Sequence, residues 1–166
     1  MRAGIDCYMG RETAAGLGLK GHRLHIVKPM ERFKADEWSI LPFPLVHDVE
    51  NFGYLMVKGS EKVLFATDTN YMPYKFKGLT HIMLGVDFDA EILKENALLG
   101  TVDPERAKRT LANHMSISTA LNFFRANDMS HVQEIWLLHL SDQNSDAERF
   151  RREVAAITGR PVLIGG

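Results

Sequence analysis

Three segments of the sequence place a histidine or an aspartate directly after an apolar run that is typical of a β-strand. The residues are His47, Asp68 and His139. In open α/β sheets, reactive side chains gather beyond the carboxyl ends of the strands. Imidazole nitrogens and carboxylate oxygens are typical zinc ligands, and a carboxylate can bridge two metal ions. The pattern therefore predicts a metal centre at one edge of a sheet. The segments are residues 43–48, 63–69 and 135–141.

Each of these residues also has an ordinary structural interpretation. His47 could be a turn histidine, and Asp68 could close an Asx-turn at the end of its strand. His139 could be a core histidine with one backbone partner, although an imidazole without a partner is costly in an apolar run. Three such residues at one sheet edge together favour the metal centre.

Further candidates lie in the second half of the chain. His114 precedes a helix start at Ser116, where backbone amides and the helix dipole favour anions, so it is either a phosphate-handling residue or a neighbour of the helix cap. Asp87 and Asp89 follow a strand that ends at Val86, where turn and N-cap roles are favoured over metal contact. Basic residues just upstream of His114 are Arg106, Lys108 and Arg109.

The overall composition is that of an ordinary soluble domain. The chain has 166 residues, of which 45% are hydrophobic and 25% are charged, and this length suits one domain with a real core. A formal net charge of -1 is not the signature of a protein that binds nucleic acid with its whole surface, although a local basic patch is compatible with it. The single cysteine, Cys7, excludes an internal disulfide and fits a reducing compartment. No apolar run approaches the length of a membrane span and no signal peptide is evident, so we expect a cytoplasmic protein.

Hydrophobic patterning predicts a β-rich first part followed by alternating helices and strands. This order favours the α/β class, with a mixed sheet and flanking helices. Turn residues 58–61 predict a hairpin between two of the strands. The proline-broken segment 38–46 predicts an edge strand or a bend. Expected strands are residues 5–8, 24–27, 38–46, 53–57, 62–67, 80–86, 135–140 and 161–164. Expected helices are residues 11–17 and 89–99, one beginning at 103–104, and residues 116–125 and 145–158, the last with a capping box at 145–148.

Six stretches, in this order along the chain, resemble the metallo-β-lactamase-fold hydrolases. The chain is most similar to small bacterial and phage members related to YycJ-type exonucleases, and more distantly to the tRNA-processing RNase Z. The resemblance covers essentially the whole chain and implies an αββα sandwich. The matching stretches are residues 3–6, 21–23, 42–48, 65–69, 114–116 and 137–145.

The resemblance implies a role for four residues. His47 would ligate a first metal ion, Asp68 would bridge two ions, and His139 would ligate the second. His114 resembles the histidine that RNase Z-type enzymes place near the scissile phosphate, where it stabilises or protonates the leaving group. The family implies one or two zinc ions, with manganese as an alternative, and a metal-bound hydroxide as the nucleophile. The expected activity is that of a phosphodiesterase or nuclease, with nucleic acid or another phosphodiester as substrate.

One departure from the family pattern is large. The signature His-x-His-x-Asp-His loop is absent, since His22 and His25 lack its spacing and its acidic partner. We therefore expect residues 1–166 to form one domain that is truncated at its N-terminus relative to the family, that is, an incomplete αββα sandwich. Each metal would have about two protein ligands, below the usual three of a catalytic zinc site. Weak zinc binding and little hydrolysis are the expected properties.

Two alternatives to a self-sufficient enzyme remain. The chain could be a non-catalytic fragment or binding module that keeps the fold without a complete metal site. It could also be an enzyme completed by another chain or by a homo-oligomer. Such a partner would cover the sheet edge that truncation exposes, which is otherwise an aggregation hazard.

Overall fold

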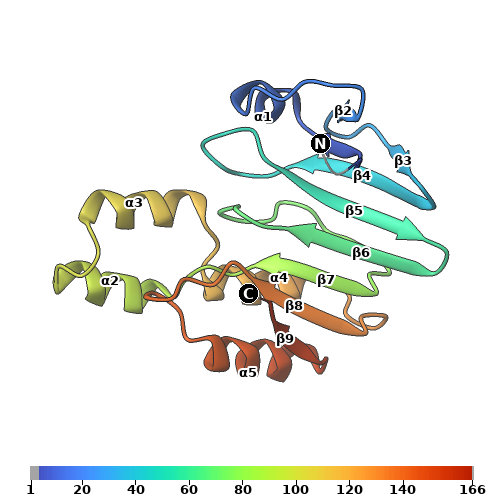
Figure 1. The fold of residues 1–166 in the computed structure, drawn as a ribbon. Helices are drawn as coiled ribbons and strands as arrows, with labels where there is room; N and C mark the ends of the chain where they lie inside the picture. Colours follow the sequence, from blue (N-terminus) through green and yellow to red (C-terminus); the bar gives the residue numbers. More distant parts are fainter. Residues whose placement is uncertain (1–3, 166) are drawn as a thin grey trace.

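The structure, a computed structural model, describes residues 4–165. Ala3, the first residue of one stretch that carries the resemblance, lies outside the described residues. A mixed seven-stranded sheet with the order β3-β4-β5-β6-β7-β8-β9 forms the centre (Figure 1). Its first four strands pair antiparallel, and β6 to β9 pair parallel. The strands are β3 (Phe33–Ala35), β4 (Trp38–Pro44), β5 (Phe52–Lys58), β6 (Glu61–Ala66), β7 (His81–Gly85), β8 (Glu134–Leu138) and β9 (Val162–Ile164). The expected α/β class with a mixed sheet and flanking helices is confirmed.

The other elements are a small N-terminal unit and four helices. In the N-terminal unit, β1 (Cys7–Met9) and β2 (Leu24–Ile26) pair parallel around α1 (Arg11–Gly16). The helices are α2 (Ala90–Leu98), α3 (Pro104–Asn113), α4 (Ile117–Ala126) and α5 (Ala147–Thr158). None of the helices in the described part of the chain combines the length and the hydropathy that a bilayer crossing requires.

Side-chain caps set where the helices begin. Asp89 and Asp103 accept hydrogen bonds from the first backbone amides of α2 and α3, and Ser116 does the same for α4. The predicted cap of α5 was wrong by one residue. Asp146 accepts from the Arg149 amide, whereas the Ser145 hydroxyl is occupied because it donates to the Ser141 carbonyl at 2.7 Å.

The proline-rich strand is not an edge strand along its whole length. Residues 33–35 form β3, a strand absent from the sequence-based expectation, and pair with the first half of β4. The last pair joins Phe33 to Ile40, so Pro42 and Pro44 lie beyond the reach of β3. A missing backbone N–H on these prolines therefore disrupts no pairing on that side of β4.

The main core lies between the sheet and helices α4 and α5. Leu64, Leu84 and Leu137 point from three strands toward Phe124 and Phe150 of the helices, and all five are at most 2% exposed. The second pair, α2 and α3, projects beyond the ends of the strands and has its own small cluster (Figure 1). Packing of α4 and α5 against the sheet thus holds β6, β7 and β8 in place, and with them the edge at which these strands end.

Truncation of Phe150 is expected to test this packing. Phe150→Ala should lower the free energy of unfolding by about 3–5 kcal/mol, because a fully buried aromatic side chain leaves a cavity when it is removed. Ile157→Ala, on the same helix but at a 38% exposed position, is the control and should cost much less. Urea unfolding measures both, and equal losses for the two variants would contradict the packing described.

Candidate metal centre

Four side chains from four segments converge at the carboxyl edge of the parallel strands. Asp68 follows β6, Asp87 follows β7, and His139 follows β8, while His114 is the C-cap residue of α3. One ligand-type atom of each residue lies within 4.8 Å of those of the other three. Parallel strands end at the same edge of a sheet, which is why residues that are far apart in sequence meet there.

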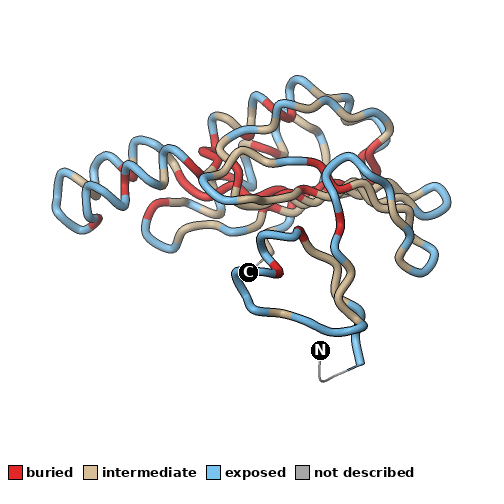
Figure 2. Tube along the Cα trace, turned by 90° about the horizontal axis from the view of Figure 1, so that it is seen from above, coloured by how far each residue is buried: buried red, intermediate tan, exposed pale blue. Residues whose placement is uncertain are grey.

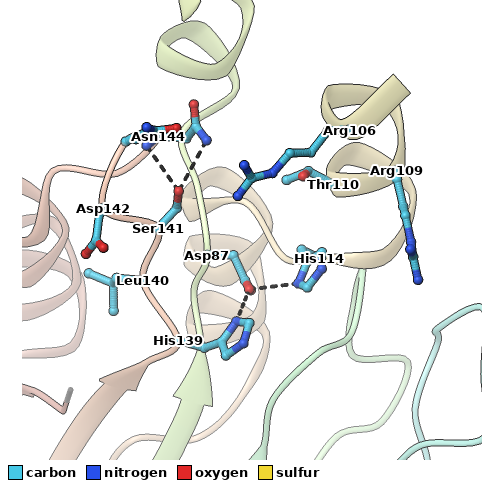
Figure 3. Close-up of a pocket in the computed structure, with 11 residues that line it drawn as sticks. Asp87, Arg106, Arg109, Thr110, His114, His139, Leu140, Ser141, Asp142 and Asn144 are labelled. Atoms are coloured by element: carbon cyan, nitrogen blue, oxygen red, sulfur yellow. Dashed lines mark hydrogen bonds and ion pairs between the residues drawn. The ribbon is translucent and has the colours of Figure 1, made fainter. Parts of the chain in front are cut away.

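Asp87 is the buried centre of this group. It is 4% exposed, and its Oδ1 accepts hydrogen bonds from Nδ1 of His114 at 2.8 Å and from Nδ1 of His139 at 2.5 Å (Figure 3). Its backbone N–H donates to the Met115 carbonyl, and its own carbonyl accepts from the Ser141 amide. Asp87 therefore holds both imidazole rings in place, and the backbone around it is itself fixed.

The second ring nitrogen of His139 faces a carboxylate. With the ring proton on Nδ1, where it donates to Asp87, Nε2 presents a lone pair. That nitrogen lies 3.4 Å from Oδ1 of Asp68, which also presents lone pairs. Two acceptors at this separation repel unless a cation or a proton lies near both. The donor set is thus one nitrogen and one carboxylate oxygen, which suits a zinc-type divalent ion.

Asp68 and His139 are two of the four non-glycine residues with positive φ among residues 4–165, the others being Met30 and Asp36. Asp68 has φ of 54° and His139 has φ of 59°, in the left-handed region that residues other than glycine seldom adopt. Strain of this kind persists where the surrounding structure over-determines it, and it gathers at functional sites. Here it turns both side chains toward each other immediately after their strands end.

The hydrogen bond from His114 to Asp87 raises the pKa of His114 above its ordinary value. Partial burial opposes this shift, the charges of Asp87 and Asp68 add to it, and Arg109 reduces it. Without bound metal, His114 therefore keeps its proton at higher pH than a free imidazole does.

Two polar residues couple the segments that carry the site. Thr69, which is 1% exposed, accepts a hydrogen bond from the Val46 amide through Oγ1. The Asn70 side-chain amide donates to the carbonyls of Leu111 and Ala112 at the end of α3. The loop after β6 is thereby tied both to the segment that leads to His47 and to the helix that leads to His114.

The structure brings together three of the four site residues expected from the sequence, and it adds one. His47 is outside the group of four, and its Nδ1 pairs with Oδ1 of Asp48 at 2.8 Å. Its ring packs edge-on against that of His114, with the centroids 5.8 Å apart. Asp87, for which the sequence favoured a turn or cap role, joins the group instead, whereas Asp89 is an N-cap as expected. The signal that could have identified Asp87 is its place directly after the apolar run of residues 82–86, most of which forms the parallel strand β7.

A pocket of about 640 Å³ opens beside the group of four. Asp87, His114 and His139 form one wall, and α3 contributes Arg106 and Arg109 to another (Figure 3). The remaining lining residues are Thr110, Leu140, Ser141, Asp142, Gln143 and Asn144. The site thus combines metal-type donors with a basic wall.

Comparison of the sequence with protein-family models and with curated proteins finds no match. Solved structures do match. The metallo-β-lactamase fold protein YhfI from Bacillus subtilis matches with a TM-score of 0.66 at 15% identity, over 95% of this chain and 61% of that one. Zn²⁺-bound PqqB from Methylobacterium extorquens matches with a TM-score of 0.64 at 12% identity, over 96% of this chain and 62% of that one. A protein from Parabacteroides distasonis, provisionally named a metal-dependent hydrolase, matches with a TM-score of 0.63 at 16% identity. The match covers 96% of this chain and 63% of that one.

The chain has the metallo-β-lactamase fold. It spans about three-fifths of the length of these three structures. Within this metallo-β-lactamase fold, the group of four lies at the carboxyl edge of the parallel strands, where the sequence pattern predicted ligands.

Proposed function

We propose that the chain carries one side of a divalent metal centre for the hydrolysis of phosphodiesters. One observation carries the proposal: Nε2 of His139 and Oδ1 of Asp68 face each other at 3.4 Å, while the buried Asp87 holds the other nitrogen of His139. Metal-bound histidines usually donate their second ring N–H to a carboxylate in this way, which fixes the tautomer and strengthens the ligand.

The residues divide into ligands and supports. Asp68 and His139 would hold the ion, with His47 as a further proposed ligand, and Asp87 would orient His139 and His114. Zinc suits these nitrogen and oxygen donors, with manganese as the alternative, and PqqB with the same fold is Zn²⁺-bound. A bound divalent ion supplies activated water and stabilises negative charge on a phosphate.

The pocket favours an anionic substrate. Arg109 lines it and also pairs with Asp48 at 3.2 Å. Arg106 points from α3 into the pocket and has no ion pair with any residue in 4–165 (Figure 3). An arginine in this position can donate two parallel hydrogen bonds to phosphate oxygens. His114, beside the basic wall, would give a proton to the leaving oxygen.

Arg106→Ala tests the phosphodiester assignment. In the presence of Zn²⁺ or Mn²⁺, we expect slow turnover of bis-p-nitrophenyl phosphate and a KM raised about tenfold in the variant, because a charge-assisted contact to the substrate is lost. The kcat should change little. Arg151→Ala, which removes an arginine on α5 paired with Glu148, should leave KM unchanged. Hydrolysis of p-nitrophenyl acetate but not of the phosphodiester would contradict the substrate class.

A second candidate is a module that binds metal without turnover. Its support is the openness of the site, since the side chains of His139 and Asp68 are 50% and 35% exposed. Catalytic zinc sites usually have three protein ligands and exclude bulk water. Saturable zinc binding with no phosphodiester turnover would favour this candidate over the hydrolase.

A further inference from the structure

The loop that follows β8 carries a hydroxyl group, that of Ser141, with both lone pairs engaged. Ser141 lies two residues after His139 and lines the pocket beside the metal centre. Its Oγ accepts hydrogen bonds from the backbone N–H and from Nδ2 of Asn144, both at 3.2 Å (Figure 3). A hydroxyl has two acceptor lone pairs and one proton. The proton of Ser141 is therefore left to donate to another group.

The orientation of the Asn144 side-chain amide decides the direction of one of these bonds, since an amide can be turned end for end. A chain of contacts fixes that orientation. The Gln143 carbonyl can only accept, so the Asn96 group 2.8 Å from it is the NH₂ group. The same NH₂ group lies 3.0 Å from the Asn144 side chain, and the Asn144 atom that accepts from it is the oxygen. The NH₂ group of Asn144 consequently faces Ser141, whose hydroxyl must accept.

The backbone around this hydroxyl is held from several sides. Asn144 is 5% exposed, and its carbonyl accepts from the Asp89 amide at 2.7 Å. The Ser141 amide donates to the Asp87 carbonyl at 2.8 Å, and the Ser145 hydroxyl donates to the Ser141 carbonyl at 2.7 Å. Within the described part of the chain, the hydroxyl proton of Ser141 has no acceptor. Ser141 thus presents a fixed donor to the pocket.

A second unpaired donor lines the same pocket from α3. Figure 3 shows the Arg106 side chain pointing from α3 toward the loop that carries Ser141. The pocket also contains the carboxylates of Asp87 and Asp142. The Asp87 carboxylate is engaged by two imidazoles, so the pocket offers its free donors chiefly through Arg106 and Ser141. A group with several acceptor oxygens and negative charge complements such a pair.

We propose that Ser141 and Arg106 together bind the phosphate group of the substrate, each donating to a different non-bridging oxygen. The choice of phosphate as the ligand rests on the proposed function. A tetrahedral anion presents oxygens in diverging directions and can meet donors from two walls. A carboxylate presents both oxygens on one side and would need only the arginine fork. In this assignment Ser141 is a binding residue, which neither ligates a metal ion nor transfers a proton.

A titration of the metal-free protein with inorganic phosphate tests the assignment without any hydrolysis. The side-chain NMR signals of Asn144 and Arg106 in the presence of a chelator report binding. Ser141→Ala should raise the Kd for phosphate about tenfold, because a hydrogen bond to a charged oxygen is lost. Ser145→Ala is the matched control on the same loop. Its hydroxyl proton is already used by the Ser141 carbonyl, so this variant should leave the Kd unchanged.

Asn144→Asp reverses the bond to Ser141 while keeping the two residues joined. A carboxylate can only accept, so the Ser141 O–H turns away from the pocket and donates to it. The new charge also weakens phosphate binding in this variant. In its background, however, Ser141→Ala should change the Kd by less than about twofold, because the donor is already withdrawn.

Three results would overturn the assignment. They are the absence of phosphate binding by the parent protein, an equal loss in Ser141→Ala and Ser145→Ala, and an equal effect of Ser141→Ala in the parent and in Asn144→Asp. Each of these can occur alongside phosphodiester turnover and would then leave the proposed function intact. Phosphate binding that depends on Ser141, without turnover of the phosphodiester, would support the assignment and contradict only the hydrolase.

Discussion

Replacement of Asp68 by alanine is expected to weaken zinc binding by at least about a hundredfold without unfolding the chain. The reason is that Asp68 offers the carboxylate facing Nε2 of His139, while the carboxylate of Asp87 is engaged by two imidazole N–H groups. Loss of a directly coordinating group should exceed the tenfold to hundredfold typical of an outer partner. Competition with a chromophoric zinc chelator measures the affinity.

Asp36 provides a matched control for Asp68. It is also an aspartate with positive φ, 53° against 54°, but it lies in the turn between β3 and β4, away from the group of four. Asp36→Ala carries the same kind of backbone cost without removing a proposed ligand. Equal zinc affinities for the two variants would show that Asp68 is not a ligand.

Asp87→Asn should have the second largest effect. Both imidazoles bond to Oδ1, which the amide oxygen can replace only as a weaker, uncharged acceptor. The NH₂ group would take the place of Oδ2 and face the Met115 N–H, which donates to Oδ2 in the parent. We expect a tenfold to hundredfold lower zinc affinity and a loss of about 1–3 kcal/mol in the free energy of unfolding. Asp89→Asn is the control two residues away. It alters the cap of α2 and the contact with Arg149, and so changes stability while leaving zinc affinity unchanged.

The same variant should remove a pH dependence from the metal-free protein. Because Asp87 raises the pKa of folded His114, the protonated pair stabilises the native state fully below the ordinary histidine pKa near 6.5. This stabilisation is lost as the pH rises through the higher pKa of folded His114. Urea unfolding at pH 5.5 and 8.5 should therefore show a smaller difference in Asp87→Asn than in the parent. An unchanged difference would mean that other groups cause the pH dependence.

The sequence predicted those parts of the site that depend on local pattern. His139 and Asp68 stand where apolar runs end, and parallel pairing of β6 to β8 brings such positions to one edge. Asp87 was missed because its neighbour Asp89 has a strong N-cap pattern, so the whole segment resembled an ordinary turn. Its actual role depends on burial and on two histidines that are 27 and 52 residues away.

The fold shows the same division between local and tertiary causes. Most elements were predicted from apolar alternation, helix caps and turn residues, including the hairpin of β5 and β6. The strand β3 was not, because three residues carry no period and pair only once β4 is present. His47 also follows an apolar run, yet it lies outside the group of four, and the run alone does not distinguish these two outcomes.

A zinc titration followed through the imidazole NMR signals of the seven histidines tests the central claim most directly. The claim is that Asp68 and His139 hold a divalent metal ion, with Asp87 and His114 beside it. Saturable binding should then shift the ring signals of His139 and His114 and leave those of His22, His25, His81 and His131 in place. Absence of saturable binding, or shifts confined to these four other histidines, would contradict the account.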